Sequence, residues 1–139
     1  MRVVLYTNIV ISALLYQGST RRFQELWKNH KIKVFATQAV LGEYVRVLHY
    51  PKFGYESELI TELLQEHLLP WLFHGDDYRG RLVYPSADRD DDNFLRAALS
   101  AKAEVLVSGD PDLTDLNGKY DFPILPPGPF LSRYFTRRK

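Results

Sequence analysis

The fold is read most directly from PSADRDDDNFLRAALSAKAEVLVSGDPDL, residues 85–113. The stretch joins an acidic run to an apolar helix and then to an apolar strand. Residues 90–102 are predicted to be helical, because their apolar positions keep helical spacing. These positions are Phe94, Leu95, Ala98 and Leu99. Residues 104–108 are predicted to be a buried strand, and Gly109 is a turn residue.

The acidic run Asp88-Arg89-Asp90-Asp91-Asp92 carries four carboxylates in five positions, although the net charge of the chain is only +1. Packing them together is unfavourable unless a positive group lies among them. Solvent counter-ions, a helix N-terminus or a divalent metal could supply it. One or two carboxylates are enough to cap a helix. Both a metal site and a solvated, over-charged helix start therefore stay open.

Strands and helices alternate along the rest of the chain. Strands are predicted over residues 2–6, 33–36, 81–84, 104–108 and 123–125. Helices are predicted over residues 9–16, 20–29, 38–50, 56–69, 90–102 and 130–135. Ser19 or Thr20 is expected to cap the second helix and Thr37 the third, while residues 110–121 are expected to be a polar loop. This order predicts one α/β domain over residues 1–139, with a central, mainly parallel sheet between two helical layers.

Ligand sites in such sheets lie beyond the carboxyl ends of the strands. Two polar segments occupy such positions, Tyr6-Thr7-Asn8 and Ser108-Gly109-Asp110. Helices of these units run antiparallel to their strands. On this basis we expect the start of the helix at 90–102 to lie at the opposite edge from Asp110, unless the preceding loop carries it around.

Composition excludes several kinds of site. The chain has no cysteine, so it has neither disulfides nor cysteine zinc sites. Its histidines lack a ligand spacing: they are His30, His49, His67 and His74. No apolar run reaches the length of a membrane span, and no cleavage site follows the apolar N-terminal segment. We therefore expect a cytoplasmic protein. The remaining option for a metal is a hard cation such as Mg²⁺ or Mn²⁺ on carboxylate oxygens.

Three segments resemble the PIN-domain family, and most closely its VapC-type toxin branch. They are VVLYTNIVISALL (3–15), ATQAVLGEYVRVL (36–48) and residues 85–113. The resemblance covers most of the chain in the right order. It implies an α/β/α fold that brings four acidic positions to one edge of the sheet. It also implies Mg²⁺ or Mn²⁺ as cofactor and cleavage of single-stranded RNA.

Site residues follow from the resemblance by position. The implied metal ligands are Glu43, Asp90, Asp91, Asp92, Asp110 and Asp112. The implied catalytic residues are Glu43, Asp91, Asp92 and Asp110. Asp91 or Asp92 is the best choice for the third acidic position, because the family varies in register there. Without the family, the spacing favours a solvated helix residue at Glu43 and ordinary loop residues at Asp110 and Asp112.

Tyr6 departs from the family pattern. The family carries Asp-Thr-Asn after the first strand, whereas this chain carries Tyr6-Thr7-Asn8. A phenol is neutral at pH 7 and a poor ligand for Mg²⁺. Asn8 and Ser108 match the polar residues that flank the site. Tyr6 predicts weak or absent activity, either because the protein is naturally inactive or because the substitution arose during cloning of a harmful nuclease.

The resemblance also implies a homodimer and an antitoxin that reaches the carboxylates with an Arg or Lys side chain. Two functions compete: a metal-dependent endoribonuclease of a toxin–antitoxin system, and a non-catalytic module that binds antitoxin or RNA. A phospho-acceptor receiver domain is a third α/β fold with an acidic pocket. It requires adjacent acids after the first strand, and Tyr6-Thr7-Asn8 lacks them.

Overall fold

A computed structural model describes residues 1–15 and 20–136. Its centre is a five-stranded sheet in the order β3-β2-β1-β4-β5, in which every pairing is parallel. The strands are β1 (Arg2–Leu5), β2 (Lys33–Ala36), β3 (Leu72–His74), β4 (Val105–Val107) and β5 (Ile124–Leu125). The predicted parallel α/β fold is therefore confirmed.

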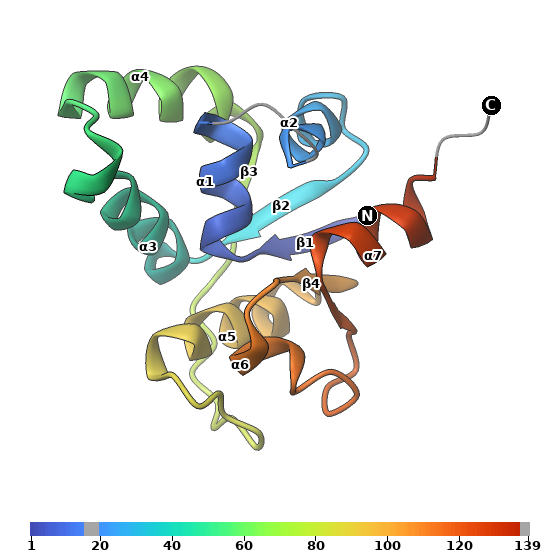
Figure 1. Ribbon diagram of the computed structural model, residues 1–139. Coiled ribbons are helices and arrows are strands. Elements are labelled where there is room, and N and C mark those ends of the chain that lie inside the picture. The colour runs from blue at the N-terminus through green and yellow to red at the C-terminus, as the bar shows by residue number, and fades with distance from the viewer. Residues whose placement is uncertain (16–19, 137–139) are drawn as a thin grey trace.

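Helices cover both faces of the sheet. Figure 1 shows α1 and α2 on one face and α5 on the other, with α3 beside the sheet. The helices are α1 (Thr7–Leu15), α2 (Arg21–Lys28), α3 (Gln38–Leu48), α4 (Ser57–His67), α5 (Asp92–Ala101), α6 (Pro111–Thr114) and α7 (Pro127–Tyr134). Of the helices described, none combines the length and apolar character that a membrane crossing requires.

Buried apolar side chains explain why these segments take these places. The central strand β4 is apolar and buried along its length, and β1 is so after its exposed first residue, Arg2, as expected for parallel strands covered on both faces. On α5, the predicted positions Phe94, Leu95 and Ala98 are buried against the sheet, while Leu99 is only half-buried. Thr37 caps α3 as predicted, since its hydroxyl accepts a hydrogen bond from the Val40 amide.

Two local predictions were wrong. Residues 81–84 form no strand; the additional strand is β3, which pairs with β2. The start of the expected loop at 110–121 is instead the short helix α6, in which Asp110 caps the first turn and Pro111 takes the first position. Of the two residues expected to cap α2, Thr20 takes the N-cap position, but its side chain makes no capping hydrogen bond. The alternative cap, Ser19, lies outside the described residues, as does Tyr16 at the end of the first predicted helix.

Tyr44 connects α3 to the end of β1. Its buried hydroxyl donates a hydrogen bond of 2.5 Å to the carbonyl oxygen of Leu5. Burial raises the pKa of Tyr44, so the phenol stays protonated and keeps donating. Because Leu5 immediately precedes Tyr6, this contact holds the backbone from which the candidate site begins.

Replacing Tyr44 with Phe removes this hydrogen bond and keeps the ring. We expect the free energy of unfolding in urea to fall by about 1–2 kcal/mol, because the Leu5 carbonyl loses a buried donor. Tyr50→Phe is the matched control: Tyr50 is 39% exposed, and its substitution should change stability by less than about 0.5 kcal/mol. Equal effects of the two substitutions would contradict the role given to Tyr44.

Candidate metal centre

The site lies where β1 and β4 end side by side. Leu5 of β1 is in register with Val107 of β4, and the Tyr6 amide donates to the Val107 carbonyl at 2.9 Å. The chain then turns away on opposite sides of this pair, since β2 and β5 flank it. Such a switch in strand order leaves a crevice at the carboxyl ends. Tyr6 and Ser108 are the first residues beyond the two strands.

The helix that carries the acidic run begins at this same edge. Our expectation that it would begin at the opposite edge from Asp110 was wrong. The helix α5 precedes β4 and runs antiparallel to it, so its first residues lie where β4 ends. The Tyr6 hydroxyl, which lies 3.0 Å from both Asp91 and Asp110, shows the two acidic segments to be neighbours.

Tyr6 places a neutral hydroxyl between two carboxylates. The hydroxyl oxygen lies 3.0 Å from Oδ1 of Asp91 and 3.0 Å from Oδ2 of Asp110. Burial and the neighbouring carboxylates raise the pKa of Tyr6, so its phenol stays protonated. A hydroxyl has only one proton to donate, and two carboxylates share it here. The ring itself packs against Phe94, with centroids 4.9 Å apart.

Asp91 is the carboxylate that the fold buries most deeply. It is 4% exposed, and its Oδ2 has no hydrogen-bond partner among residues 1–15 and 20–136. Burial raises the pKa of Asp91 to about 6; the Tyr6 hydrogen bond opposes this shift, and Asp110, Asp88 and Asp112 add to it. A buried, unpaired carboxylate oxygen calls for a proton or a cation.

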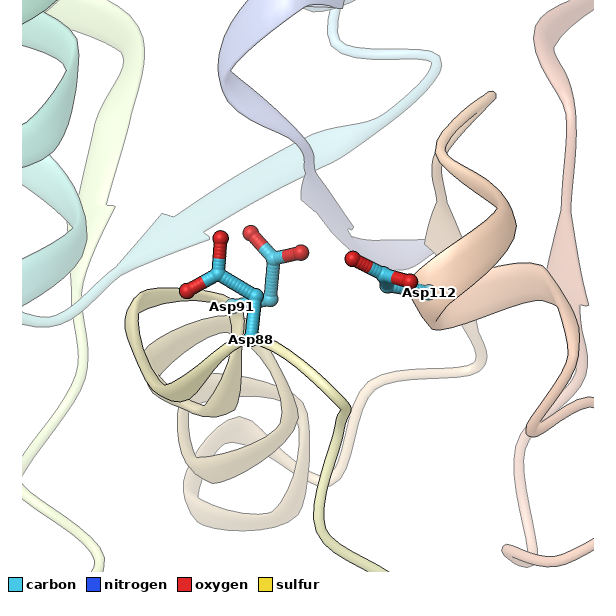
Figure 2. A group of neighbouring side chains, drawn as sticks. All are labelled: Asp88, Asp91 and Asp112. Atoms are coloured by element: carbon cyan, nitrogen blue, oxygen red, sulfur yellow. The ribbon is translucent and has the colours of Figure 1, made fainter.

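Three carboxylates converge beside Tyr6. Asp88, Asp91 and Asp112 each present an oxygen, and these oxygens lie within 4.8 Å of one another. Figure 2 shows Asp88 and Asp91 coming from the turn before α5 and Asp112 from α6. Oxygen atoms alone form this donor set, which suits a hard divalent cation. The unpaired Oδ2 of Asp91 supports the same fit.

Of the six predicted ligands, only Asp91 and Asp112 belong to this group of three; Glu43, Asp90, Asp92 and Asp110 lie outside it. Glu43 forms an ion pair and hydrogen bond with Arg46, one turn further along α3. The same Arg46 guanidinium lies 3.9 Å from Asp90, whose side chain is 69% exposed. Arg46 thus lies between Glu43 of α3 and Asp90 of the turn before α5.

The structure separates the two candidates for the third acidic position. Asp91 faces Tyr6 and the other carboxylates. Asp92 accepts a hydrogen bond of 2.7 Å from the Ser86 amide, and it lines a different cavity on the far side of the acidic run. The 3-10 turn Arg89–Asp91 directs the side chains of Asp91 and Asp92 to these different places.

Asp88 belongs to the group of three, although from sequence we name it only as part of the acidic run and not among the ligands. The regular spacing of Asp88 and Asp91 is the signal that could have identified it, since residues three apart share one side of a turn. Asp88 also accepts a hydrogen bond from the Asp90 amide at 3.0 Å.

The flanking residues hold the backbone of the site. Ser108 is fully buried, and its hydroxyl accepts a hydrogen bond of 3.0 Å from the Asp110 amide. Asp110 in turn accepts from the Asp112 amide at 2.9 Å, which caps α6. Asn8 lines a cleft of about 440 Å³ together with Tyr6 and Asp110. This cleft is the open approach to the carboxylates from the α1 side.

A family model described as the PIN domain matches residues 2–112, which include β1, β4 and every candidate ligand. The chain belongs to the PIN domain family. PIN-domain proteins are generally nucleases that use divalent metals, and the all-oxygen cluster agrees with that chemistry. Comparison with curated proteins found no match.

One solved structure with a similar fold is described as the crystal structure of VapBC2 from Rickettsia felis bound to a DNA fragment from their promoter. The TM-score is 0.59 and the sequence identity 19%, and the match covers 90% of this chain and 97% of that chain. At this identity the likeness shows that the PIN fold is shared.

The raised pKa of Asp91 makes stability depend on pH. Its folded pKa of about 6 lies above the ordinary value of 3.8, so the folded state holds the proton more tightly. Stability should therefore fall as pH rises from about 4 through about 6. Asp91→Asn removes the buried charge, and in EDTA at pH 7.5 it should raise the free energy of unfolding by about 1–3 kcal/mol.

Asp90→Asn is the control for this prediction, because the Asp90 side chain is 69% exposed. Asp90→Asn should change the free energy of unfolding only slightly at every pH. Urea denaturation at pH 4 and pH 7.5 measures both variants, and the gain from Asp91→Asn should shrink at pH 4. An Asp91→Asn protein no more stable than the unsubstituted chain at pH 7.5 would show that the buried charge of Asp91 does not destabilise the fold.

Proposed function

We propose that this PIN domain is the toxin of a toxin–antitoxin pair, an endoribonuclease for single-stranded RNA that depends on Mg²⁺ or Mn²⁺. The carrying observation is the buried Asp91 Oδ2, which lacks a partner in the described part of the chain and lies beside two further carboxylates. Because isolated buried charge is unfavourable, this oxygen fits a metal ligand better than a helix cap.

Asp91, Asp88 and Asp112 would hold the cation, with Asp110 beside them and Glu43 at the margin. When bound, the cation supplies an activated water and stabilises the leaving oxygen of a phosphodiester. The chain itself orients the ligands: Ser108 holds the Asp110 backbone, and Asp110 holds that of Asp112. Glu43 can turn to the cation only after leaving Arg46, its ion-pair partner.

Tyr6 weakens this site in our proposal. Its neutral hydroxyl occupies the space between Asp91 and Asp110, where the family pattern has a further carboxylate. One negative charge is thereby lost from the ligand set, and the larger side chain fills room that the cation needs. These contacts favour a second function, a non-catalytic PIN module that binds antitoxin or RNA without cleaving.

The proposed partners follow from the toxin assignment and from the fold shared with VapBC2. An antitoxin would place an Arg or Lys side chain against the carboxylates, where the charge is unbalanced. We further propose a homodimer formed by one domain per chain, acting in the cytoplasm. Exposed apolar side chains around α4 offer surface for such contacts: Tyr50, Tyr55 and Leu59.

Replacing Tyr6 with Asp tests the proposal. It adds a carboxylate next to Asp91 and Asp110 and empties the space of the phenol ring. We expect Mn²⁺ binding to tighten at least tenfold in calorimetry, because a charged oxygen ligand replaces a neutral one. Cleavage of a fluorescently labelled single-stranded RNA should rise with it, and EDTA should abolish that cleavage.

Two further variants control this experiment. Tyr6→Phe removes the hydroxyl and keeps the ring, so it should restore neither metal binding nor cleavage. Adding Asp91→Asn to Tyr6→Asp should remove both gains. A Tyr6→Asp protein that binds Mn²⁺ tightly and cuts no RNA would contradict the nuclease and leave the binding module as the better function.

A further inference from the structure

A second cavity lies on the other side of the acidic run. It measures about 680 Å³, large enough for a nucleotide. Its lining residues are Pro85, Ser86, Ala87, Arg89, Asp92, Asn93 and Arg96. The two sites share one wall, because the Ser86 hydroxyl donates to the Asp112 carbonyl at 3.3 Å and accepts from the Asp88 amide at 3.2 Å. A polymer crossing this cavity would pass directly beside the carboxylates.

Positive charge lines this cavity. Arg89 is exposed at its edge, and Arg96 lies deeper, where one guanidinium nitrogen donates to the Gly80 carbonyl at 3.0 Å. The one lining carboxylate, Asp92, is held by the Ser86 amide. Two cations thus face a single, hydrogen-bonded anion. A polyanion repelled by the neighbouring acidic cluster would find its favourable contacts here.

An aromatic platform adjoins the cavity. Tyr84 precedes the lining residue Pro85 and is 43% exposed. The Tyr120 hydroxyl donates to the Tyr84 carbonyl at 2.6 Å, and the two rings meet nearly at right angles with centroids 6.1 Å apart. Tyr120 also stacks on the buried Phe122, with centroids 5.2 Å apart. The platform is therefore anchored in the core.

A cation accompanies this platform as well. Lys119 Nζ lies 5.5 Å from the centre of the Tyr84 ring. Figure 1 shows both segments, the loop before α5 and the chain after α6, on the face of the sheet that α5 covers. Exposed aromatic rings interleaved with cations are typical of surfaces that bind unpaired nucleotides, since every base can stack and every phosphate is negative.

We propose that this surface is the substrate-binding groove for single-stranded RNA, in which a base stacks on Tyr84 and Arg89, Arg96 and Lys119 contact the phosphates. The choice of RNA rests on the proposed function. Stacking on Tyr84 requires an unpaired base, which excludes duplex RNA. RNA bound in this groove would lie with a phosphodiester next to Asp88 and Asp112, because Ser86 lines the groove and contacts the backbone of both residues.

Fluorescence anisotropy with a labelled oligouridylate, measured on the full chain in EDTA, tests this groove apart from catalysis. Tyr84→Ala should weaken binding about five- to tenfold through lost stacking, and Tyr84→Trp should keep it. Arg89→Ala should weaken binding and reduce the slope of log K against log salt by about 0.7, the value for one phosphate contact on a single strand.

Phe73→Ala is the matched control, because the Phe73 ring is 41% exposed and has a cation beside it, Lys33, but lies on β3 at the opposite edge of the sheet from β5. Its RNA affinity should equal that of the unsubstituted chain. If Tyr84→Ala and Arg89→Ala also bind RNA as tightly as that chain, the groove proposal is wrong, and Tyr84 serves a protein contact instead. That result leaves the nuclease proposal intact if Tyr6→Asp cleaves RNA. The opposite result is also distinguishable. If Tyr84→Ala and Arg89→Ala lose RNA affinity while the control keeps it, and Tyr6→Asp cleaves no RNA, the groove is supported and the nuclease is contradicted.

Discussion

Concentrated negative charge at the carboxyl ends of β1 and β4 is the constraint on which the site depends. Parallel pairing of these strands brings Tyr6, Asp110 and the start of α5 together, whatever their distance in sequence. Burial then deprives Asp91 of water. A phenol in this place donates one proton and no positive charge, so it satisfies the carboxylates only in part. The fold thus leaves negative charge at this edge of the sheet that Tyr6 does not neutralise.

The sheet could largely be predicted from sequence because its central strands are short, apolar and β-branched. Residues 33–36 form β2 as predicted, and residues 105–107 form β4 within the predicted range. The strand β3 was missed because three residues carry too little pattern, and only pairing with β2 makes them a strand. Residues 81–84 have side chains that favour a strand, but in the structure they pair with no neighbouring strand. Their composition therefore led to a wrong prediction.

The candidate site was predictable as a region and not as a set of contacts. The resemblance places acids in the right segments, but Asp91 and Asp92 differ only in where one turn of backbone directs them. The 3-10 turn at residues 89–91 decides this, whereas the apolar pattern predicted a regular helix from residue 90. The same turn brings in Asp88. Helix direction was misjudged for a simpler reason: a helix antiparallel to its strands begins where those strands end.

Ser86 gives this arrangement a mechanical property. Its amide holds Asp92, and its hydroxyl contacts the backbone of both Asp88 and Asp112. One residue therefore sets the separation between the turn before α5 and the helix α6. A shift of the loop at residues 85–87 would therefore act through Ser86 on the distance between the Asp88 and Asp112 backbones. We expect that a molecule bound in the cavity beside this loop would change the spacing of the carboxylates, and that the two sites would respond to each other.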